Sequence, residues 1–255
     1  MLNILFLSSF LMISNLGSIN SVSDSGIYHR DNNIITVDFP LRGIWIAPNT
    51  PGTKVPSHGT SSFGESYAID FVMIRDNDIF KKPYGESFIR YLFQGLALSD
   101  FYGWGQTIYS PIDGEVVSVV DSIEERNPVR ILNDIANMVK VTKNYIQNND
   151  SPEKVAGNYI LIQHSTDLYV LLAHLKKGSI IVKSGQKIHT NQPLGQLGHS
   201  GNSTMPHLHM QFMNSKDFKT AKGIPFVFKK YEVKHDGKWE EVHNSIPTVK
   251  NIIRY

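Results

Sequence analysis

The sequence predicts a mainly β protein, an antiparallel β barrel or sandwich with an open groove and a helical insertion on its surface. Short β-branched and aromatic runs alternate with glycine- and proline-rich turns, a spacing typical of all-β folds. Residues 122–157 interrupt this rhythm with apolar side chains at helical spacing. Of the 255 residues, 41% are hydrophobic and 19% charged, so the chain can bury a core without disulfide or metal cross-links.

The strand-like runs fall on both sides of the insertion. Within the insertion we expect one helix, which ends before the turn-forming Asn-Asp-Ser-Pro at 149–152. The expected strands before it are residues 43–47, 67–74, 107–111 and 114–120, and those after it are 158–163, 168–173, 192–197 and 208–213.

One domain over residues 24–255 accounts for this pattern. It carries the insertion at about 122–157 and a β-rich C-terminal extension at about 216–255. The extension has nine Lys or Arg and five Asp or Glu, a net charge of +4, which we interpret as a solvated face.

The N-terminal segment resembles a signal peptide, which we place at residues 1–23. Residues 1–19 are mostly apolar, and Ser21-Val22-Ser23 offers small residues for signal-peptidase cleavage. No Lys or Arg precedes the apolar run, and serines interrupt it, so it makes a poor membrane span. We expect a secreted, periplasmic or cell-envelope protein without a stable membrane span after cleavage.

Composition excludes several kinds of chemistry. The formal charge of +2 does not support a nucleic-acid binder. Cysteine is absent, which excludes disulfides, thiolate zinc sites and cysteine nucleophiles. The ten histidines leave imidazole-based metal binding and acid–base catalysis open.

The triplet His207-Leu208-His209 is the most informative local feature. Alternate residues on a strand point to one face, so two imidazoles would enter the same space. Glycine-rich segments and a third histidine surround it in a fixed order. These are Gly157-Asn158 before an apolar run, Ala173-His174-Leu175, Gly185-Gln186, and Gly198-His199-Ser200-Gly201.

This ordered set resembles the lysostaphin-type zinc metalloendopeptidases, which are peptidoglycan endopeptidases with a duplicated hybrid motif fold. The similarity covers about residues 56–75 and 104–213. It implies one zinc per chain and, as substrate, peptidoglycan or its peptide cross-links. It also implies that Asp70 and His209 bind zinc, while His174 and His207 form a catalytic pair that activates water and stabilises the oxyanion.

The sequence departs from the family pattern at the first metal ligand. The family has a histidine four residues before the aspartate, but here that position is Ser66. If the chain reverses about Ser62, His58 lies opposite Ser66 and can reach the empty space, so we expect His58 to be the third ligand. Glu65 is the alternative, although strand alternation points it to the other face.

Two further functions remain compatible with parts of the pattern. A non-catalytic relative would bind cell-wall peptide or activate another hydrolase, and zinc stoichiometry separates it from an enzyme. A phosphocarrier domain has a similar β fold, but Asp70 as a ligand and the export signal argue against it. Outside the site, we expect His164 to be structural and His199 to line the groove at most.

Overall fold

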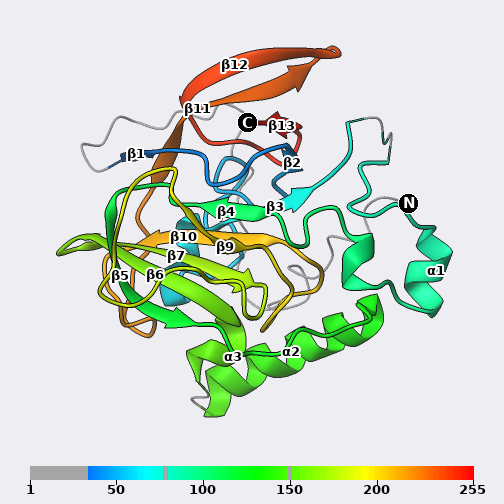
Figure 1. Cartoon of the computed structure of the whole chain (residues 1–255), viewed down its shortest axis with the longest axis horizontal. Helices are drawn as coiled ribbons and strands as arrows, with labels where there is room; N and C mark the ends of the chain where they lie inside the picture. The colour runs from blue at the N-terminus through cyan, green and yellow to red at the C-terminus, as the bar shows by residue number, and fades with distance from the viewer. Residues whose placement is uncertain (1–33, 77, 79, 149–150) are drawn as a thin grey trace, which may run out of the picture.

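The computed structural model describes residues 34–255 except 77, 79 and 149–150 (Figure 1). In this part of the chain, eleven strands join in one sheet of order β1-β11-β13-β2-β3-β10-β7-β6-β5-β8, with β12 paired to β11. Every strand pair is antiparallel except β1 with β11. The strands are β1 (Ile35–Val37), β2 (Ile44–Ile46), β3 (Ile69–Met73), β5 (Gly114–Val120), β6 (Asn158–Ser165), β7 (Leu168–Leu175), β8 (Lys187–Ile188), β10 (Leu208–Met213), β11 (Phe226–His235), β12 (Lys238–Ser245) and β13 (Ile253–Arg254).

A second, two-stranded sheet pairs β4 (Thr107–Tyr109) with β9 (Pro193–Gln196). Strands β7 and β10 lie in the middle of the large sheet, and all their residues are buried. The side chains of these two strands are therefore buried on both faces of the sheet. The predicted mainly β fold class is confirmed.

The main core is built around aromatic rings. Phe39 lies 5.0 Å from Phe71 and 4.8 Å from Phe228, measured between ring centroids. All three are fully buried. Such pairs stabilise a core beyond the area they bury, and they join β3 to β11 behind the site described below.

The insertion contains two helices, α2 (Ile131–Asn148) and α3 (Pro152–Ala156), where the sequence predicted one. The Ser151 hydroxyl accepts a hydrogen bond from the Glu153 amide, and Pro152 occupies the first turn of α3. Both features favour a helix start at this point. Gly157, with φ +68°, ends α3 and leads directly into β6.

Residues 76–105, which have no regular sequence pattern, include α1 (Phe88–Phe93) and a 3₁₀ turn at Leu98–Asp100. Their buried apolar side chains form a second core with Val129 and Ile131 at the start of α2. The insertion is therefore fastened to the body of the protein at its N-terminal end.

Figure 1 shows α2 and α3 on one side of the sheets and the β11–β12 hairpin at the opposite end. The C-terminal region after residue 216 contributes β11, β12 and β13. Among the described residues, no helix is both long and apolar enough to cross a membrane. The predicted signal peptide, residues 1–23, lies outside the described part of the chain.

Candidate metal centre and active site

Asp70 and His209 meet through the register of two central strands. In the antiparallel pair β3–β10, His209 is the direct partner of Asp70. Directly opposed side chains share a sheet face with Cβ atoms about 5 Å apart. The His209 Nδ1 atom accordingly lies 2.9 Å from Asp70 Oδ1, and both residues are buried.

His58 reaches the same carboxylate from a loop. Its Nε2 atom lies 3.0 Å from Asp70 Oδ2. The chain between them reverses through a 3₁₀ segment, Ser62–Tyr67, in which Phe63 and Gly64 have left-handed backbone angles. We expected the chain to reverse about Ser62 and place His58 opposite Ser66; instead, the 3₁₀ segment brings His58 to Asp70.

Ser66, at the usual ligand position, is not among the residues that line the cavity. Ser66 packs against Gly223: a Cβ atom added to that glycine would lie 3.2 Å from the Ser66 Cβ atom. Glu65 lines the cavity instead. Strand alternation predicted that Ser66 would face the site and Glu65 would not. That alternation does not apply here, because the two residues lie in a 3₁₀ turn rather than a strand.

The three predicted ligands form a group suited to zinc. The ligand atoms of His58, Asp70 and His209 all lie within 4.8 Å of one another. Two imidazole nitrogens and one carboxylate oxygen are a common donor set for a catalytic zinc, and three protein ligands leave a fourth position open. The residues present therefore fit the ion that the sequence argument expected.

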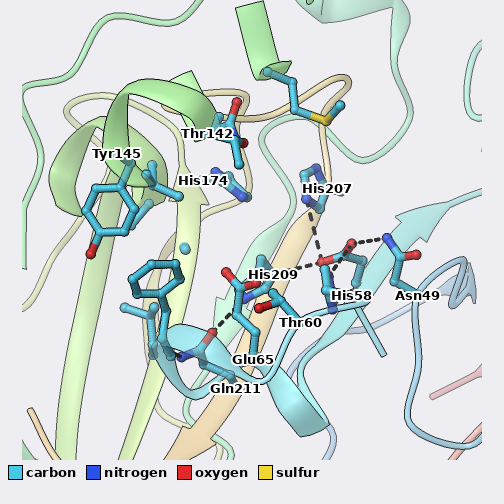
Figure 2. Close-up of a pocket in the computed structure, with 18 of the residues that line it drawn as sticks. Asn49, His58, Thr60, Glu65, Thr142, Tyr145, His174, His207, His209 and Gln211 are labelled. Atoms are coloured by element: carbon cyan, nitrogen blue, oxygen red, sulfur yellow. Dashed lines mark hydrogen bonds and ion pairs between the residues drawn. The ribbon is translucent and has the colours of Figure 1, made fainter. Parts of the chain in front are cut away.

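The other two predicted histidines stand beside this group. The ring centroid of His174 is 4.7 Å from that of His207 and 5.9 Å from that of His209. His207 Nε2 is 3.7 Å from Asp70 Oδ1. All five predicted site residues line one cavity, in which Figure 2 labels the four histidines.

His174 reaches the site because its backbone breaks the strand pattern. Ala173 is the β7 partner of His209, so a regular strand would send the next side chain to the opposite face. His174 has φ +64°, a left-handed conformation that is unfavourable for a residue with a side chain. Such strain is concentrated at functional sites.

Backbone acceptors fix the tautomers of the two histidines. A carbonyl can only accept, so His174 Nδ1–H donates to Ser200 O at 3.0 Å, and His207 Nδ1–H donates to Met205 O at 2.8 Å. In both rings this leaves Nε2 with a free lone pair. Burial lowers the pKa of both histidines, most strongly for His174, and outweighs the neighbouring Asp70. Both rings are therefore neutral near pH 7.

Without a metal, Asp70 and His209 form a buried ion pair. Burial alone would raise the pKa of Asp70, but electrostatic attraction to His58 and the hydrogen bonds with His209 and His58 hold it well below the usual range. Burial lowers the pKa of His209, but its hydrogen bond and attraction to Asp70 outweigh this and raise the pKa to about 9. A metal binding at Nδ1 must displace that proton.

A second layer of side chains orients the ligands. Gln211 Oε1 accepts from His209 Nε2–H at 2.9 Å, and its amide donates to Phe63 O at 2.8 Å. Asn49 donates to Asp70 Oδ2 at 2.7 Å. Neither residue was expected from the sequence. Strand alternation places Gln211 beside His209 and was a usable signal, whereas nothing in the sequence pointed to Asn49.

The site opens into a cavity of about 800 Å³, and α2 forms one of its walls. Figure 2 shows Thr142 and Tyr145 of this helix across the cavity from Asn49. The ring of Tyr145 packs against Phe63, with centroids 4.6 Å apart. Thr142 Oγ1 accepts a hydrogen bond from Asn202, which lies in the loop before His207. The insertion therefore shapes the groove.

Two other histidines have different surroundings. His164 Nδ1 lies 2.7 Å from Asp113 O, a hydrogen-bonded position as expected, although the residue is exposed. His199 was expected at the groove, but it is fully buried, and its Nδ1 lies 2.9 Å from Ser203 Oγ. It belongs to the interior between the insertion and the loop before His207.

Known proteins resemble parts of this chain. Residues 96–221 match the model of peptidase family M23. An uncharacterized metalloprotease of Buchnera aphidicola subsp. Baizongia pistaciae is 42% identical over 71 residues, which is 26% of this chain and 18% of that protein. The peptidoglycan DD-endopeptidase ShyA of Vibrio cholerae is 43% identical over 58 residues, which is 23% of this chain and 13% of that protein. The chain thus matches less than a fifth of each relative's length.

Solved structures give distant matches. The catalytic domain of lysostaphin from Staphylococcus simulans is 18% identical, with a TM-score of 0.35 over 74% of this chain and 88% of that one. The M23 metalloprotease pseudoalterin is 10% identical, with a TM-score of 0.40 over 82% and 98%. The sequence similarity to peptidase family M23 thus lies in residues 96–221, the part of the chain that contains His174, His207 and His209.

Proposed function

We propose that this protein is a zinc-dependent endopeptidase that hydrolyses peptide bonds in bacterial peptidoglycan. The observation that carries the proposal is the convergence of His58, Asp70 and His209 beside two neutral histidines with free Nε2 atoms. The name of the Vibrio cholerae relative supports peptidoglycan as the substrate. The apolar N-terminal segment supports action outside the cytoplasm, as a secreted, periplasmic or cell-envelope enzyme.

The proposed roles follow from the geometry. His58, Asp70 and His209 would hold one zinc ion, which when bound polarises a scissile carbonyl and makes water more acidic. His207 and His174, neutral and with Nε2 free, can accept a proton from attacking water and return it to the leaving amine. In the imidazolium form the same groups can stabilise negative charge on the carbonyl oxygen.

The non-catalytic alternative is less well supported. It arose because Ser66 replaces the usual histidine, but His58 completes the donor set from the loop. A protein that only binds cell-wall peptide has no need for a neutral histidine pair held by backbone acceptors beside such a set.

Digestion of purified peptidoglycan, followed by chromatography and mass spectrometry of the fragments, tests the proposal. The zinc-loaded protein should release new peptide amino termini, and His207→Ala should abolish release while it retains zinc. His189→Ala, at a surface histidine outside the cavity, serves as the control and should be fully active. A zinc-loaded, folded parent that cleaves no peptide would refute the activity.

A further inference from the structure

We infer that a buried polar network, running from the first turn of α2 to Ser203, positions His207 for catalysis. The inference rests on the proposed function, because it gives the helical insertion a role in the same reaction. The members of the network are Arg126, Asp134, His199 and Ser203. Asp134, His199 and Ser203 are each at most 1% exposed.

The network begins with an ion pair inside the insertion. Arg126 Nε donates to Asp134 Oδ1, while Asp134 Oδ2 accepts from the Arg130 amide at 2.8 Å. The Asp134 side chain is 2% exposed and the Arg126 side chain 31%, so the pair extends from the surface into the interior.

The guanidinium group of Arg126 holds the loop that leads to His207. It donates to Gly201 O at 2.8 Å and to Ser203 O at 2.5 Å. Its planar array of donors fixes both carbonyls at once. Arg126 NH2 also lies 3.4 Å from His199 Nε2. An element far away in the sequence thus sets the backbone of this loop.

His199 and Ser203 carry the contact to the catalytic ring. Burial lowers the pKa of His199. Because Ser203 Oγ gives its proton to Met205 O, His199 Nδ1–H donates to Ser203 Oγ at 2.9 Å, while His199 Nε2 lies 3.4 Å from Arg126 NH2 and 3.5 Å from Asp134 Oδ1. Ser203 donates in turn to Met205 O at 2.6 Å. Ser203 Oγ is 3.2 Å from His207 Nδ1, and Met205 O is the main acceptor of that nitrogen.

The consequence is an imidazole whose orientation depends on α2. His207 must keep Nδ1–H directed at Met205 O so that Nε2 faces the metal group. Ser203 holds both the Met205 carbonyl and the Nδ1 edge of the His207 ring, and His199 in turn holds the Ser203 hydroxyl. His207 remains the catalytic residue, and the network residues are positioning residues.

Serine and histidine variants of the zinc-loaded protein test the inference. Ser203→Ala and His199→Phe should lower kcat about 10- to 100-fold, the usual effect of removing an orienting partner, with KM and zinc content unchanged. His199→Asn should restore most of kcat, because the asparagine amide can replace Nδ1–H. The double variant His199→Phe/Ser203→Ala should be no slower than the slower single variant.

Ser110→Ala is the matched control. Ser110 is also fully buried, and its hydroxyl also donates at 2.6 Å to the carbonyl two residues ahead, that of Ile112. It lies outside the cavity lining. Its loss should lower stability as Ser203→Ala does and leave kcat unchanged. Equal kcat effects of the two serine variants would overturn the inference, as would a Ser203→Ala enzyme as fast as the parent.

An NMR measurement without substrate separates this inference from the proposed function. The Nδ1 proton of His207 should be visible and protected from exchange in the parent and in Ser110→Ala. It should be broadened or lost in Ser203→Ala. That result in a parent with no peptidase activity would refute the proposed function and leave the positioning role intact. An unchanged signal in Ser203→Ala would overturn the positioning role whether or not the parent is active.

Discussion

Gln211 determines how tightly His209 is held for zinc, and the hydrogen bond of its carbonyl oxygen can be separated by substitution from those of its amide group. Its carbonyl oxygen accepts from His209 Nε2–H at 2.9 Å, and its amide donates to Phe63 O at 2.8 Å. The side chain is 2% exposed, so water cannot easily replace either partner. Gln211→Met keeps the approximate length and removes both bonds, whereas Gln211→Glu keeps the acceptor and removes the donor.

The two variants should differ in zinc affinity. Losing the partner of a histidine ligand typically weakens metal binding about 10- to 100-fold, equivalent to about 1.4–2.8 kcal/mol. We expect this loss in Gln211→Met. Gln211→Glu should bind zinc at least as well as the parent, because a carboxylate is a stronger acceptor for Nε2–H. It should nevertheless be less stable by about 1–3 kcal/mol, because the Phe63 carbonyl loses its donor.

Competition with a chromophoric chelator measures the zinc dissociation constant, and chemical denaturation of the metal-free proteins measures stability. The reasoning fails if Gln211→Met binds zinc like the parent. It also fails if both variants lose affinity equally, since the effect would then come from the Phe63 contact.

The remaining predictions concern pH, the groove wall and the unusual ligand. Zinc must displace a proton from His209, whose pKa is raised to about 9, so zinc affinity should rise by up to about tenfold per pH unit between pH 6.5 and 9 and then level off. Isothermal titration calorimetry of zinc binding at several pH values checks this prediction. An affinity that does not change with pH would contradict it. Tyr145→Ala removes the ring that packs on Phe63 and should raise KM about tenfold with little change in kcat, as steady-state kinetics would measure. A fall in kcat alone would argue against a role of Tyr145 in substrate binding. Adding Ser66→His to His58→Ala should not restore zinc, because Ser66 lies outside the cavity lining and packs against Gly223. Recovered zinc would show that the loop can adopt the usual family arrangement.

The sequence was sufficient for the parts of the site that follow strand periodicity. His209 lies in β10 and His207 directly before its first residue, so alternation predicts both on one face, and the register of β10 then places His209 opposite Asp70. The motif order supplied the expected roles. Gln211 obeys the same alternation and was within reach of the same argument.

The other parts depend on backbone conformations that periodicity does not encode. The left-handed backbone angle at His174 turns its ring toward the site, whereas strand alternation predicts the opposite face of the sheet. The left-handed Phe63 within a 3₁₀ turn exchanges the facing of Glu65 and Ser66. Both conformations are unfavourable for the residue alone, so only tertiary contacts select them.

The network around Arg126 was hidden for a different reason. Its contacts to Gly201 and Ser203 span 75 and 77 positions in the sequence. No local pattern marks a pairing of this kind, and the insertion had no known relation to the histidine loop. The sequence thus located the helix, whereas the structure was needed to show that it forms a wall of the site.

The central claim is that a zinc site is built from His58, Asp70 and His209, and zinc content per folded chain tests it most directly. The parent, dialysed against buffered zinc and analysed by mass spectrometry of the metal, should contain one zinc. His58→Ala should lose most of it while keeping its circular dichroism spectrum. A folded parent that takes up no zinc would contradict the account, and so would full occupancy in His58→Ala.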